Sequence, residues 1–327
     1  MRTLVTGGGG FLGGAIVRRL AARGDTVRSY SRSAYDWHGP LGVESFQGDL
    51  TDRTVLSAAM AGCDAVIHVA AKAGFWGPYS EYRHANVDGT LAVLEACRST
   101  GVNRLVYTST PSVVHGGRGL EGVDESQPYP DHHESAYAAT KAEAEKAVLA
   151  ANGPELATVA IRPHLVWGPG DPHLVPRLVA RAKAGRLRKI GDGKNLVDTL
   201  YVDNAALAHE LALDRLAPGS PVAGKAYFIA QGEPKPLWDT IQSLILASGG
   251  PILPERAVPE SVAVALGGIC EALWKTLPLS GEPPMTRFVA HQLATSHWFD
   301  LSAAKNELGY EPIISFEEGL SRLKASR

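Results

Sequence analysis

The sequence predicts an α/β fold in which a doubly wound parallel sheet is joined to a smaller, mainly helical lobe. Through about residue 165, short apolar runs rich in β-branched residues alternate with helical patterns. This alternation is typical of parallel strands joined by helical crossovers. The first run breaks into four glycines, Gly7–Gly10, and a helical pattern follows directly. Residues 231–327 are instead rich in proline, glycine and tryptophan and lack strand alternation, which favours helices there.

Taken in order, the apolar runs place the strands and the patterns between them place the helices. After the run that ends at Thr6, we expect strands over 26–31, 43–47, 65–69, 104–108 and 157–161. We expect helices over 81–99 and 135–151, and near 174–184 after a loop rich in proline and glycine. The following stretches predict a strand over 196–202, a helix over 203–216 and the last strand of the sheet over 225–230.

Composition excludes several classes of protein. The formal net charge is −2, so the chain has no field that attracts nucleic acid or an anionic membrane. Its three cysteines, Cys63, Cys97 and Cys270, have neither metal-ligand spacing nor the pattern of a disulfide framework. We therefore expect no metal site and a reducing, cytoplasmic location. The longest apolar stretch, 262–269, is too short to span a bilayer, although contact with a membrane surface through it stays open.

The glycines after the first strand have the spacing of a phosphate-binding turn. Gly7 permits a tight turn, Gly10 lets the backbone approach a pyrophosphate, and Gly13 lets helix and strand pack closely. The first helical residues, Phe11 and Leu12, would present free N–H groups to the anion. The turn predicts a dinucleotide cofactor, and a glycine-rich turn without a ligand is the alternative.

Residues after the second and third strands indicate which dinucleotide is bound. An NAD site carries an acidic residue about 20 residues beyond the glycines, whereas this chain has Ser31, Arg32 and Ser33 there. Because an arginine holds a 2′-phosphate through charge-assisted hydrogen bonds, we expect NADP(H). Asp49 and Leu50 follow the third strand, and Asp49 could accept from the adenine amino group, cap the next helix over 52–60, or do both.

A tyrosine and a lysine four residues apart carry the strongest catalytic signal. Tyr137 and Lys141 share one face of the predicted helix 135–151. The ammonium is therefore expected to lower the pKa of the phenol, which would then exchange a proton with a carbonyl oxygen. Thr110, at the carboxyl end of the strand 104–108, offers a hydroxyl to the substrate oxygen. The hydroxyls at this strand end, including that of Thr110, could instead bond backbone groups.

The motifs as a set resemble the extended short-chain dehydrogenase/reductases along nearly the whole chain. The set comprises the three spaced glycines, Asp49, His68-Val-Ala-Ala71, Asn86-Val-Asp-Gly-Thr90, Tyr137-x-x-x-Lys141, and Arg162-Pro163 through Trp167-Gly-Pro169. The resemblance implies a Rossmann-type domain.

The resemblance also implies roles for single residues. Tyr137 would be the acid/base, Lys141 would also hold the nicotinamide ribose, and Asn86 would support a helix bend and a proton-relay water. The cofactor would be lined by Ala70 and Ala71, and approached at its nicotinamide by Pro163 and His164. Thr110 stands where this family often has serine, so Ser109 and Ser112 stay open as alternative hydroxyl donors.

Within this family, the segments 107–113 and 72–77 resemble the 3β-hydroxysteroid dehydrogenase branch and its bacterial relatives, among them reductases of 2-alkyl-3-oxo acids. Aromatic residues could line a site for a long apolar substrate, although ordinary core packing is the expectation for most of them. The aromatic residues are Phe75, Trp76, Trp167, Trp238, Trp274, Phe288 and Trp298. Phe75 and Trp76, in a glycine-flanked loop, are the expected exceptions.

These observations predict an NADPH-dependent reductase that converts a β-keto group on a hydrophobic acyl substrate to a secondary alcohol. The alternatives are a 3β-hydroxysteroid dehydrogenase, a sugar-nucleotide epimerase that uses Arg177, Arg181 and Arg186, and an NADP(H)-sensing regulator without turnover. We expect residues 1–165, with 195–230 returning to them, to form the cofactor domain, and 166–194 with 231–327 to form the substrate lobe. The resemblance implies a homodimer through helices 81–99 and 135–151, and association with other enzymes of the pathway is open.

Overall fold

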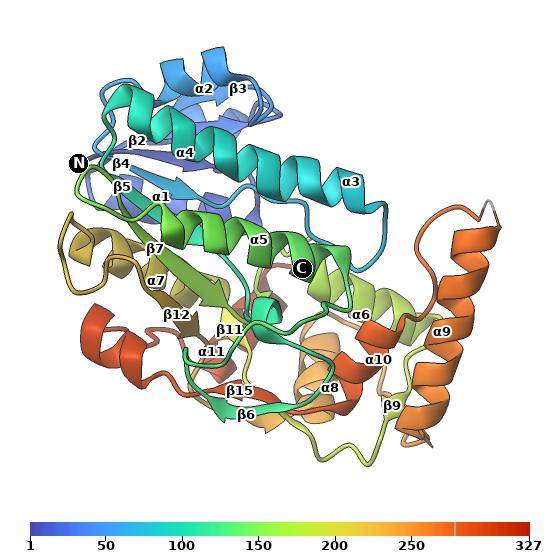
Figure 1. Cartoon of the computed structure of the whole chain (residues 1–327). Coiled ribbons are helices and arrows are strands. Elements are labelled where there is room, and N and C mark those ends of the chain that lie inside the picture. Colours follow the sequence, from blue (N-terminus) through green and yellow to red (C-terminus); the bar gives the residue numbers. More distant parts are fainter. Residues whose placement is uncertain (278) are drawn as a thin grey trace.

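The computed structural model describes residues 1–277 and 279–327, and its centre is a parallel sheet of seven strands (Figure 1). In spatial order the strands are β12 (Ala226–Ile229), β7 (Ala157–Pro163), β5 (Arg104–Thr108), β4 (Ala65–His68), β1 (Arg2–Thr6), β2 (Thr26–Ser31) and β3 (Glu44–Gln47). The order reverses between β1 and β4, which is where Rossmann-type sheets bind a dinucleotide. The predicted doubly wound fold is confirmed.

Helices cover both faces of this sheet. One face carries α1 (Phe11–Ala22) and α7 (Val202–Arg215); the other carries α2 (Arg53–Met60), α4 (Gly89–Thr100) and α5 (Ala136–Ala150). Successive strand residues face opposite layers, so that Leu4 and Val5 belong to two different apolar cores. Burial on both faces explains why the strands are continuous apolar runs rather than alternating ones.

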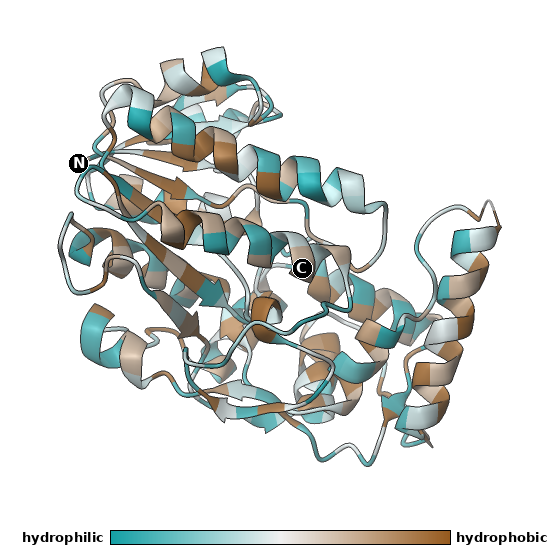
Figure 2. Cartoon of the chain, in the orientation of Figure 1, coloured by the Kyte–Doolittle hydropathy of each residue, from teal (hydrophilic) through white to brown (hydrophobic). Residues whose placement is uncertain are grey.

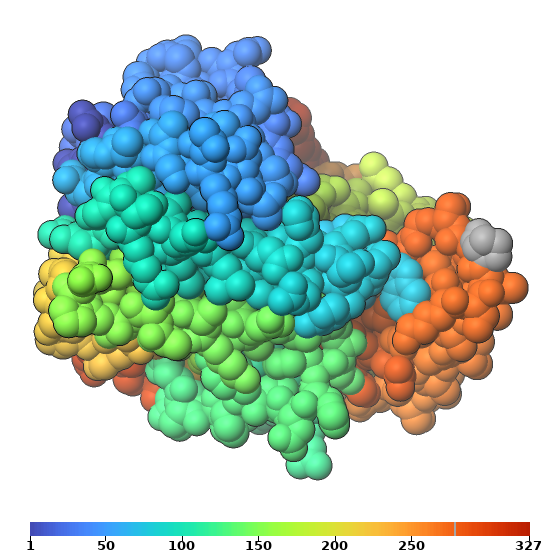
Figure 3. All heavy atoms as spheres, turned by 45° about the horizontal axis from the view of Figure 1, so that its top comes forward, coloured from blue at the N-terminus to red at the C-terminus, as the bar shows by residue number. Residues whose placement is uncertain are grey.

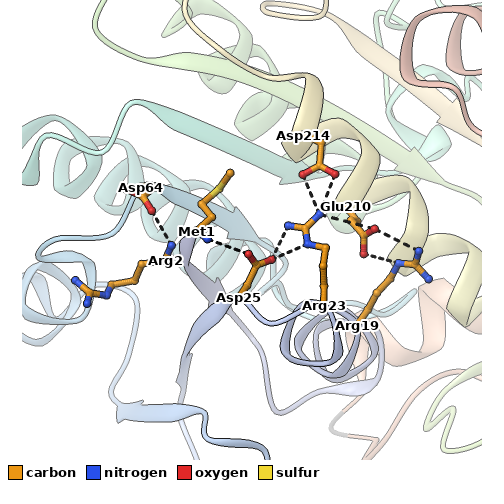
Figure 4. Close-up of polar contacts among 8 residues, drawn as sticks. All are labelled: Met1, Arg2, Arg19, Arg23, Asp25, Asp64, Glu210 and Asp214. Carbon is orange, nitrogen blue, oxygen red and sulfur yellow. Dashed lines mark hydrogen bonds and ion pairs between the residues drawn. The ribbon is translucent and has the colours of Figure 1, made fainter.

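Ion pairs join α1 to α7 at one end of the sheet (Figure 4). Arg23 lies between Asp25 and Asp214, at 2.5 and 2.8 Å, and Arg19 contacts Glu210 at 2.6 Å. The α-amino group of Met1 also contacts Asp25, at 3.0 Å. Several partly exposed charges that share partners form a network, which contributes more than isolated surface pairs do. This network holds α1, and with it the glycine turn at its other end, against the sheet.

The stretch 196–202, predicted as one strand, is instead divided between two sheets. β10 (Leu196–Val197) joins a four-stranded sheet with β13 (Lys235–Pro236), β15 (His297–Phe299) and β6 (Leu120–Val123), whereas β11 (Leu200–Tyr201) pairs with β8 (Val166–Trp167). The buried carboxylate of Asp198, between them, accepts hydrogen bonds from the backbone N–H groups of Gly232 (2.7 Å) and Glu233 (3.4 Å). This long-range contact breaks the strand.

Residues 231–327 are mainly helical as predicted, but they also contain short strands that the sequence did not reveal. The helices are α8 (Leu237–Ala247), α9 (Glu260–Thr276), α10 (Arg287–Ala294) and α11 (Phe316–Ala325), with α6 (Leu174–Lys183) packed against α8. The strands are β13, β15 and β14 (Ala257–Val258), which pairs with β9 (Lys189–Ile190). Strands of two or three residues are too short to show an alternating pattern. Across the described residues, we find no helix long and apolar enough to cross a membrane.

Candidate active site

The glycine turn has the geometry that a pyrophosphate requires. Gly7 has a φ of +69°, and a Cβ on Gly13 would lie 2.1 Å from the carbonyl oxygen of Gly7. Gly10 stands at the N-cap of α1, and among the described residues no side chain caps this helix. The first N–H groups of α1 therefore remain available to an anion. Phe11 and Leu12, which carry the first of them, are partly buried.

The expected adenosine residues lie at the carboxyl ends of β2 and β3. Arg32 is exposed just past β2, and the Ser31 hydroxyl accepts from the N–H of Gly9 at 3.2 Å, which ties β2 to the glycine turn. Hydrogen bonds from Thr51 lower the pKa of Asp49, with smaller contributions from the charges of His84 and Arg32. Arg32 and Asp49 thus face the same region.

The alternative role of Asp49 as a helix cap is wrong. The cap of α2 is Asp52, whose carboxylate accepts from the N–H of Val55 at 3.2 Å. Asp49 instead forms a local turn in which it accepts from Thr51. Leu50, beside it, packs against Gly89 at the start of α4, where an added Cβ would lie 2.8 Å from the leucine side chain. Asp49 is therefore not needed to begin α2.

A buried chain of hydrogen bonds fixes the loop after β4. The His68 ring bonds the hydroxyls of Thr6 (2.6 Å) and Thr90 (3.0 Å), and burial lowers the pKa of His68 to about 3. The Thr6 hydroxyl also accepts from the N–H of Ala70 at 3.2 Å. Ala70 lies against Gly7, where a Cβ would come within 3.0 Å of its backbone, and Ala71 follows with an exposed side chain. The neutral His68 thus connects the end of β1 to the start of α4, beside the loop that carries Ala70 and Ala71.

The helix expected over 81–99 contains a π-helical turn around Asn86. The structure has α3 (Tyr79–Tyr82), a π-helical turn (Arg83–Asp88) and then α4. The Asn86 side chain accepts from the N–H of Lys72 (2.7 Å) and donates to its carbonyl (3.1 Å) and to the hydroxyl of Thr140 on α5 (3.0 Å). A π-turn of this kind is common at functional sites. Asn86 therefore ties the β4 loop to the helix that carries Tyr137 and Lys141.

Tyr137 and Thr110 come together at the carboxyl edge of the sheet. Burial raises the pKa of Tyr137 to about 12, and a hydrogen bond with the Thr110 hydroxyl opposes this rise. Thr110 also caps the short helical turn Pro111–Val114 by accepting from the N–H of Ser112 at 3.2 Å. Ser109 is buried, and its hydroxyl has no hydrogen-bond partner within the described chain. Of the three hydroxyls considered, that of Thr110 opposes the rise in the pKa of the phenol, and it also donates to the Ser112 hydroxyl at 3.3 Å.

The expectation that Lys141 lowers the pKa of Tyr137 is wrong. Lys141 donates to the carbonyl of Thr108 at 2.5 Å and lies 4.1 Å from the centre of the Tyr107 ring. Burial lowers the pKa of the Lys141 amine to about 7, although the charge of Glu145 opposes this effect. An amine that points toward β5 and is partly neutral stabilises the phenolate of Tyr137 only weakly, so it does not lower the pKa of that residue. Burial therefore dominates the pKa of Tyr137.

Glu145 and Arg162, which the site prediction did not include, form the central ion pair of this region. The Glu145 carboxylate receives two hydrogen bonds from Arg162, at 2.6 and 3.0 Å, and one from Tyr129, at 2.6 Å. Both charged side chains are buried. Tyr137, Lys141 and Glu145 are spaced by four residues, so the pair holds the catalytic face of α5 against β7. The i+4 spacing was a signal available in the sequence.

Three buried histidines lie together near the end of β7, where Pro163 is the last residue. His164 bonds the backbone carbonyl of Asp198 at 2.6 Å, and its ring centre is 6.2 Å from that of His297. The Nε2 atoms of His297 and His115 are 3.2 Å apart. Burial lowers the pKa of His164 and of His115 to about 4. These imidazoles are therefore neutral at physiological pH, and the sequence analysis singled out only His164.

Comparison with known proteins places this site in a family. Residues 4–259 match the model of the 3-beta hydroxysteroid dehydrogenase/isomerase family. The 2-alkyl-3-oxoalkanoate reductase of Stenotrophomonas maltophilia is 54% identical over 100% of this chain and 99% of its own length.

The chain belongs to this family.

Other members and more distant folds agree with that assignment. The 2-alkyl-3-oxoalkanoate reductase of Shewanella oneidensis is 47% identical over 98% of this chain and 85% of its own length. A solved structure of MoeE5 in complex with UDP-glucuronic acid and NAD has 25% identity and a TM-score of 0.75, and the match covers 100% of this chain and 98% of the other. The similar proteins are named reductases and dehydrogenases. This family member is therefore an oxidoreductase with a nicotinamide dinucleotide cofactor.

Three of the seven aromatic residues considered for the substrate site, Trp167, Trp238 and Phe288, are buried. Trp167 is fully buried against Tyr201 and Phe316, and Trp238 is also buried. Phe75 differs because it is 41% exposed. Its ring packs against that of Phe288 on α10, with 5.7 Å between the ring centres.

The loop that contains Phe75 thus meets the C-terminal segment at the surface. Figure 3 shows the loop after β4 lying against this segment. Trp76, Trp274 and Trp298 are partly exposed. Phe288 also lies 6.2 Å, between ring centres, from His115, which follows the helical turn that Thr110 caps.

Replacement of Glu145 by Gln should destabilise the protein by about 3–5 kcal/mol, because it leaves the buried guanidinium of Arg162 without its charged partner. Urea unfolding measures this change. The control is Glu143→Gln on the exposed side of the same helix, which should change the free energy of unfolding by less than about 0.5 kcal/mol. Equal stability of the two variants would contradict the role assigned to the ion pair.

Proposed function

We propose that this protein is a ketoreductase that uses NADPH to reduce the β-keto group of a long-chain 2-alkyl-3-oxo acid, or a similar hydrophobic acyl substrate, to a secondary alcohol. The observation that carries the proposal is the interaction of Tyr137 with Thr110 at the same carboxyl edge of the parallel sheet as the glycine turn. Two relatives that match nearly the whole chain are named 2-alkyl-3-oxoalkanoate reductases, which supports the substrate class.

The chemistry of reduction divides between the cofactor and the chain. The glycine turn and the ends of β4 and β7 would hold the dinucleotide, whose reduced nicotinamide would supply the hydride. Tyr137, kept protonated by a pKa of about 12, donates its phenolic proton to the carbonyl oxygen. Thr110 donates a second hydrogen bond to the same oxygen and orients it. Lys141 and Asn86 position the helix that carries Tyr137, because Lys141 bonds the carbonyl of Thr108 and Asn86 bonds the hydroxyl of Thr140.

The preference for NADPH rests on Arg32. This exposed guanidinium follows β2 at the place where an NAD enzyme carries a carboxylate. Ser31 already accepts from the glycine turn through its oxygen, so its hydroxyl hydrogen stays free for a phosphate oxygen. Arg32 and the two serines beside it together suit a 2′-phosphate.

The remaining features of the proposal concern organisation. Residues 1–165 and 195–230 form the cofactor domain, and 166–194 with 231–327 form the substrate lobe. The protein acts in the cytoplasm, which its three free cysteines support. It forms a homodimer through the outer faces of α4 and α5, and association with other enzymes of its pathway would suit an insoluble intermediate.

The function is tested by NADPH oxidation with a long-chain 2-alkyl-3-oxo acid, a 3-oxosteroid and a UDP-sugar as alternative substrates. We expect turnover of the keto acid, and a loss of roughly 10²–10⁴-fold in kcat in Tyr137→Phe, because the proton donor is removed. Cofactor binding, measured by fluorescence, should be kept in that variant. Faster turnover of the steroid, or conversion of the UDP-sugar, would replace the proposal with one of the two alternatives.

The pH dependence should report the amine of Lys141. The depressed pKa of about 7 means that the ammonium is present below this pH and is lost above it. If the ammonium is the active form, kcat/KM for ketone reduction falls as the pH rises through about 7. Lys141→Arg keeps its charge and should be slower but free of this fall. A wild-type profile that is flat around pH 7 would contradict the assignment.

Replacement of Arg32 by Ala should remove most of the preference for NADPH. A charge-assisted hydrogen bond contributes about 1.5–3 kcal/mol, which is roughly a ten- to hundredfold difference in Kd. Fluorescence titration of the wild type should show tighter binding of NADPH than of NADH, with a gap that narrows as salt is added. The variant should bind NADH almost as the wild type does. Equal wild-type affinities would make Arg32 an ordinary surface charge.

A further inference from the structure

Helix α9 stands at the edge of the molecule, away from the main sheet (Figure 1), and most of its length is hydrophobic (Figure 2). It contains only three charged residues, Glu260, Glu271 and Lys275. Helices on a protein surface usually turn their apolar side to the core and their charged side to water. The two sides of α9 depart from this pattern.

The packed side of α9 holds small residues and a carboxylate. Gly267 contacts the start of α10 so closely that a Cβ would lie 2.6 Å from the backbone of Thr286. Glu271 is buried and accepts from the backbone N–H and the guanidinium of Arg287, at 2.8 and 3.0 Å. Ala263 is the other well-buried residue of the helix. This side is therefore held to α10 by close backbone approach and polar bonds, with little apolar burial.

The opposite side of α9 is apolar and exposed. Its positions recur at intervals of three and four residues, which defines one helix face. The face consists of Val262, Ala265, Leu266, Ile269, Ala272, Leu273 and Thr276, all exposed. The large apolar residues of this face, together with Leu277 and Leu279 beyond the helix end, are 42–56% exposed. A contiguous apolar strip of this kind marks an interaction surface.

The residues of this face are arranged almost symmetrically about Ile269. Ile269 is at the centre, Leu266 and Leu273 lie on either side of it, and Val262 and Thr276 stand at the two ends. A two-fold axis through Ile269 would therefore place Leu266 of one copy against Leu273 of the second. Ala265 and Ala272 would meet in the same way, and their small side chains allow the helices to approach closely. Such self-complementarity is what an isologous interface requires.

The helix dipole also favours a second, antiparallel copy. Antiparallel pairing brings the opposite dipole ends of the two helices together, whereas Glu260 and Lys275 lie on other sides of the helix than Ile269 and do not face the partner. Anionic lipid is a poorer match, because helices that lie on membranes are rich in basic residues on their polar side. The residues that flank α9 have no basic excess, since Arg256 is accompanied by Glu255 and Glu282.

We propose that the apolar face of α9 is a contact between two copies of this chain, in which the helices pair antiparallel about Ile269. This contact is separate from the dimer through α4 and α5, whose outer faces carry charged residues such as Glu95, Arg98, Glu143 and Lys146. It does not depend on the proposed substrate or cofactor. The strip and its two flanking leucines supply the apolar centre of the interface, which a polar rim from neighbouring segments completes.

Cysteine cross-linking of the full chain tests the pairing directly. In a Cys270→Ser background, Ile269→Cys should form a disulfide-linked dimer on mild oxidation, because residues on the two-fold axis face each other. Val262→Cys and Thr276→Cys should each stay monomeric on a denaturing gel but cross-link when the two variants are mixed. Lys324→Cys, on the exposed side of α11, is the matched control and should not cross-link.

Light scattering gives the second measurement. Ile269→Glu should reduce the mass of the assembly by about half, with circular dichroism unchanged because the side chain is already exposed. Self-linking of Val262→Cys without mixed linking would indicate parallel helices and overturn the proposal. An unchanged mass in Ile269→Glu would also overturn it. So would sedimentation of the wild type with phosphatidylcholine vesicles in the absence of any cross-link, which would assign the face to lipid.

Discussion

The buried ion pair between Arg162 and Glu145 is the constraint on which the catalytic region depends. It joins α5 to β7, the strand that leads to Pro163 and His164, through two short hydrogen bonds, and Tyr129 adds a third. Removing two charges from water is costly unless the geometry is good and the remaining lone pairs are satisfied. Here the two hydrogen bonds are short and Tyr129 satisfies a further lone pair of Glu145, while Nη1 of Arg162 has no partner among the described residues. The result is a fixed orientation for the inner face of α5.

Tyr137 and Lys141 share this fixed face, and desolvation there moves their pKa values apart. The phenol is raised to about 12 and the amine is lowered to about 7. A phenol that keeps its proton at neutral pH is suited to protonate a carbonyl oxygen. The amine is close to half-protonated, and the nearby Glu145 determines how much of the charge remains. The same ion pair thus positions the acid/base residue and sets the charge of its neighbour.

The cofactor side of the site is held in a different way, by neutral hydrogen bonds. Thr6, His68, Thr90 and Asn86 connect the end of β1 to the β4 loop and the π-turn before α4. Since His68 stays neutral, these hydrogen bonds do not change with pH in the physiological range. Asn86 continues it to Thr140 on α5. The two halves of the site, one ionic and one neutral, therefore meet on a single helix.

The sequence by itself determined the seven-stranded sheet, the glycine turn and the shared face of Tyr137 and Lys141. These features are local, because strand burial, glycine conformation and i, i+4 spacing are all encoded within a few residues. Tertiary structure decided the break of 196–202 at Asp198 and the orientation of Lys141 toward Thr108. It also assembled His115, His164 and His297. These depend on partners far apart in the chain or on small differences in burial, neither of which a sequence pattern expresses.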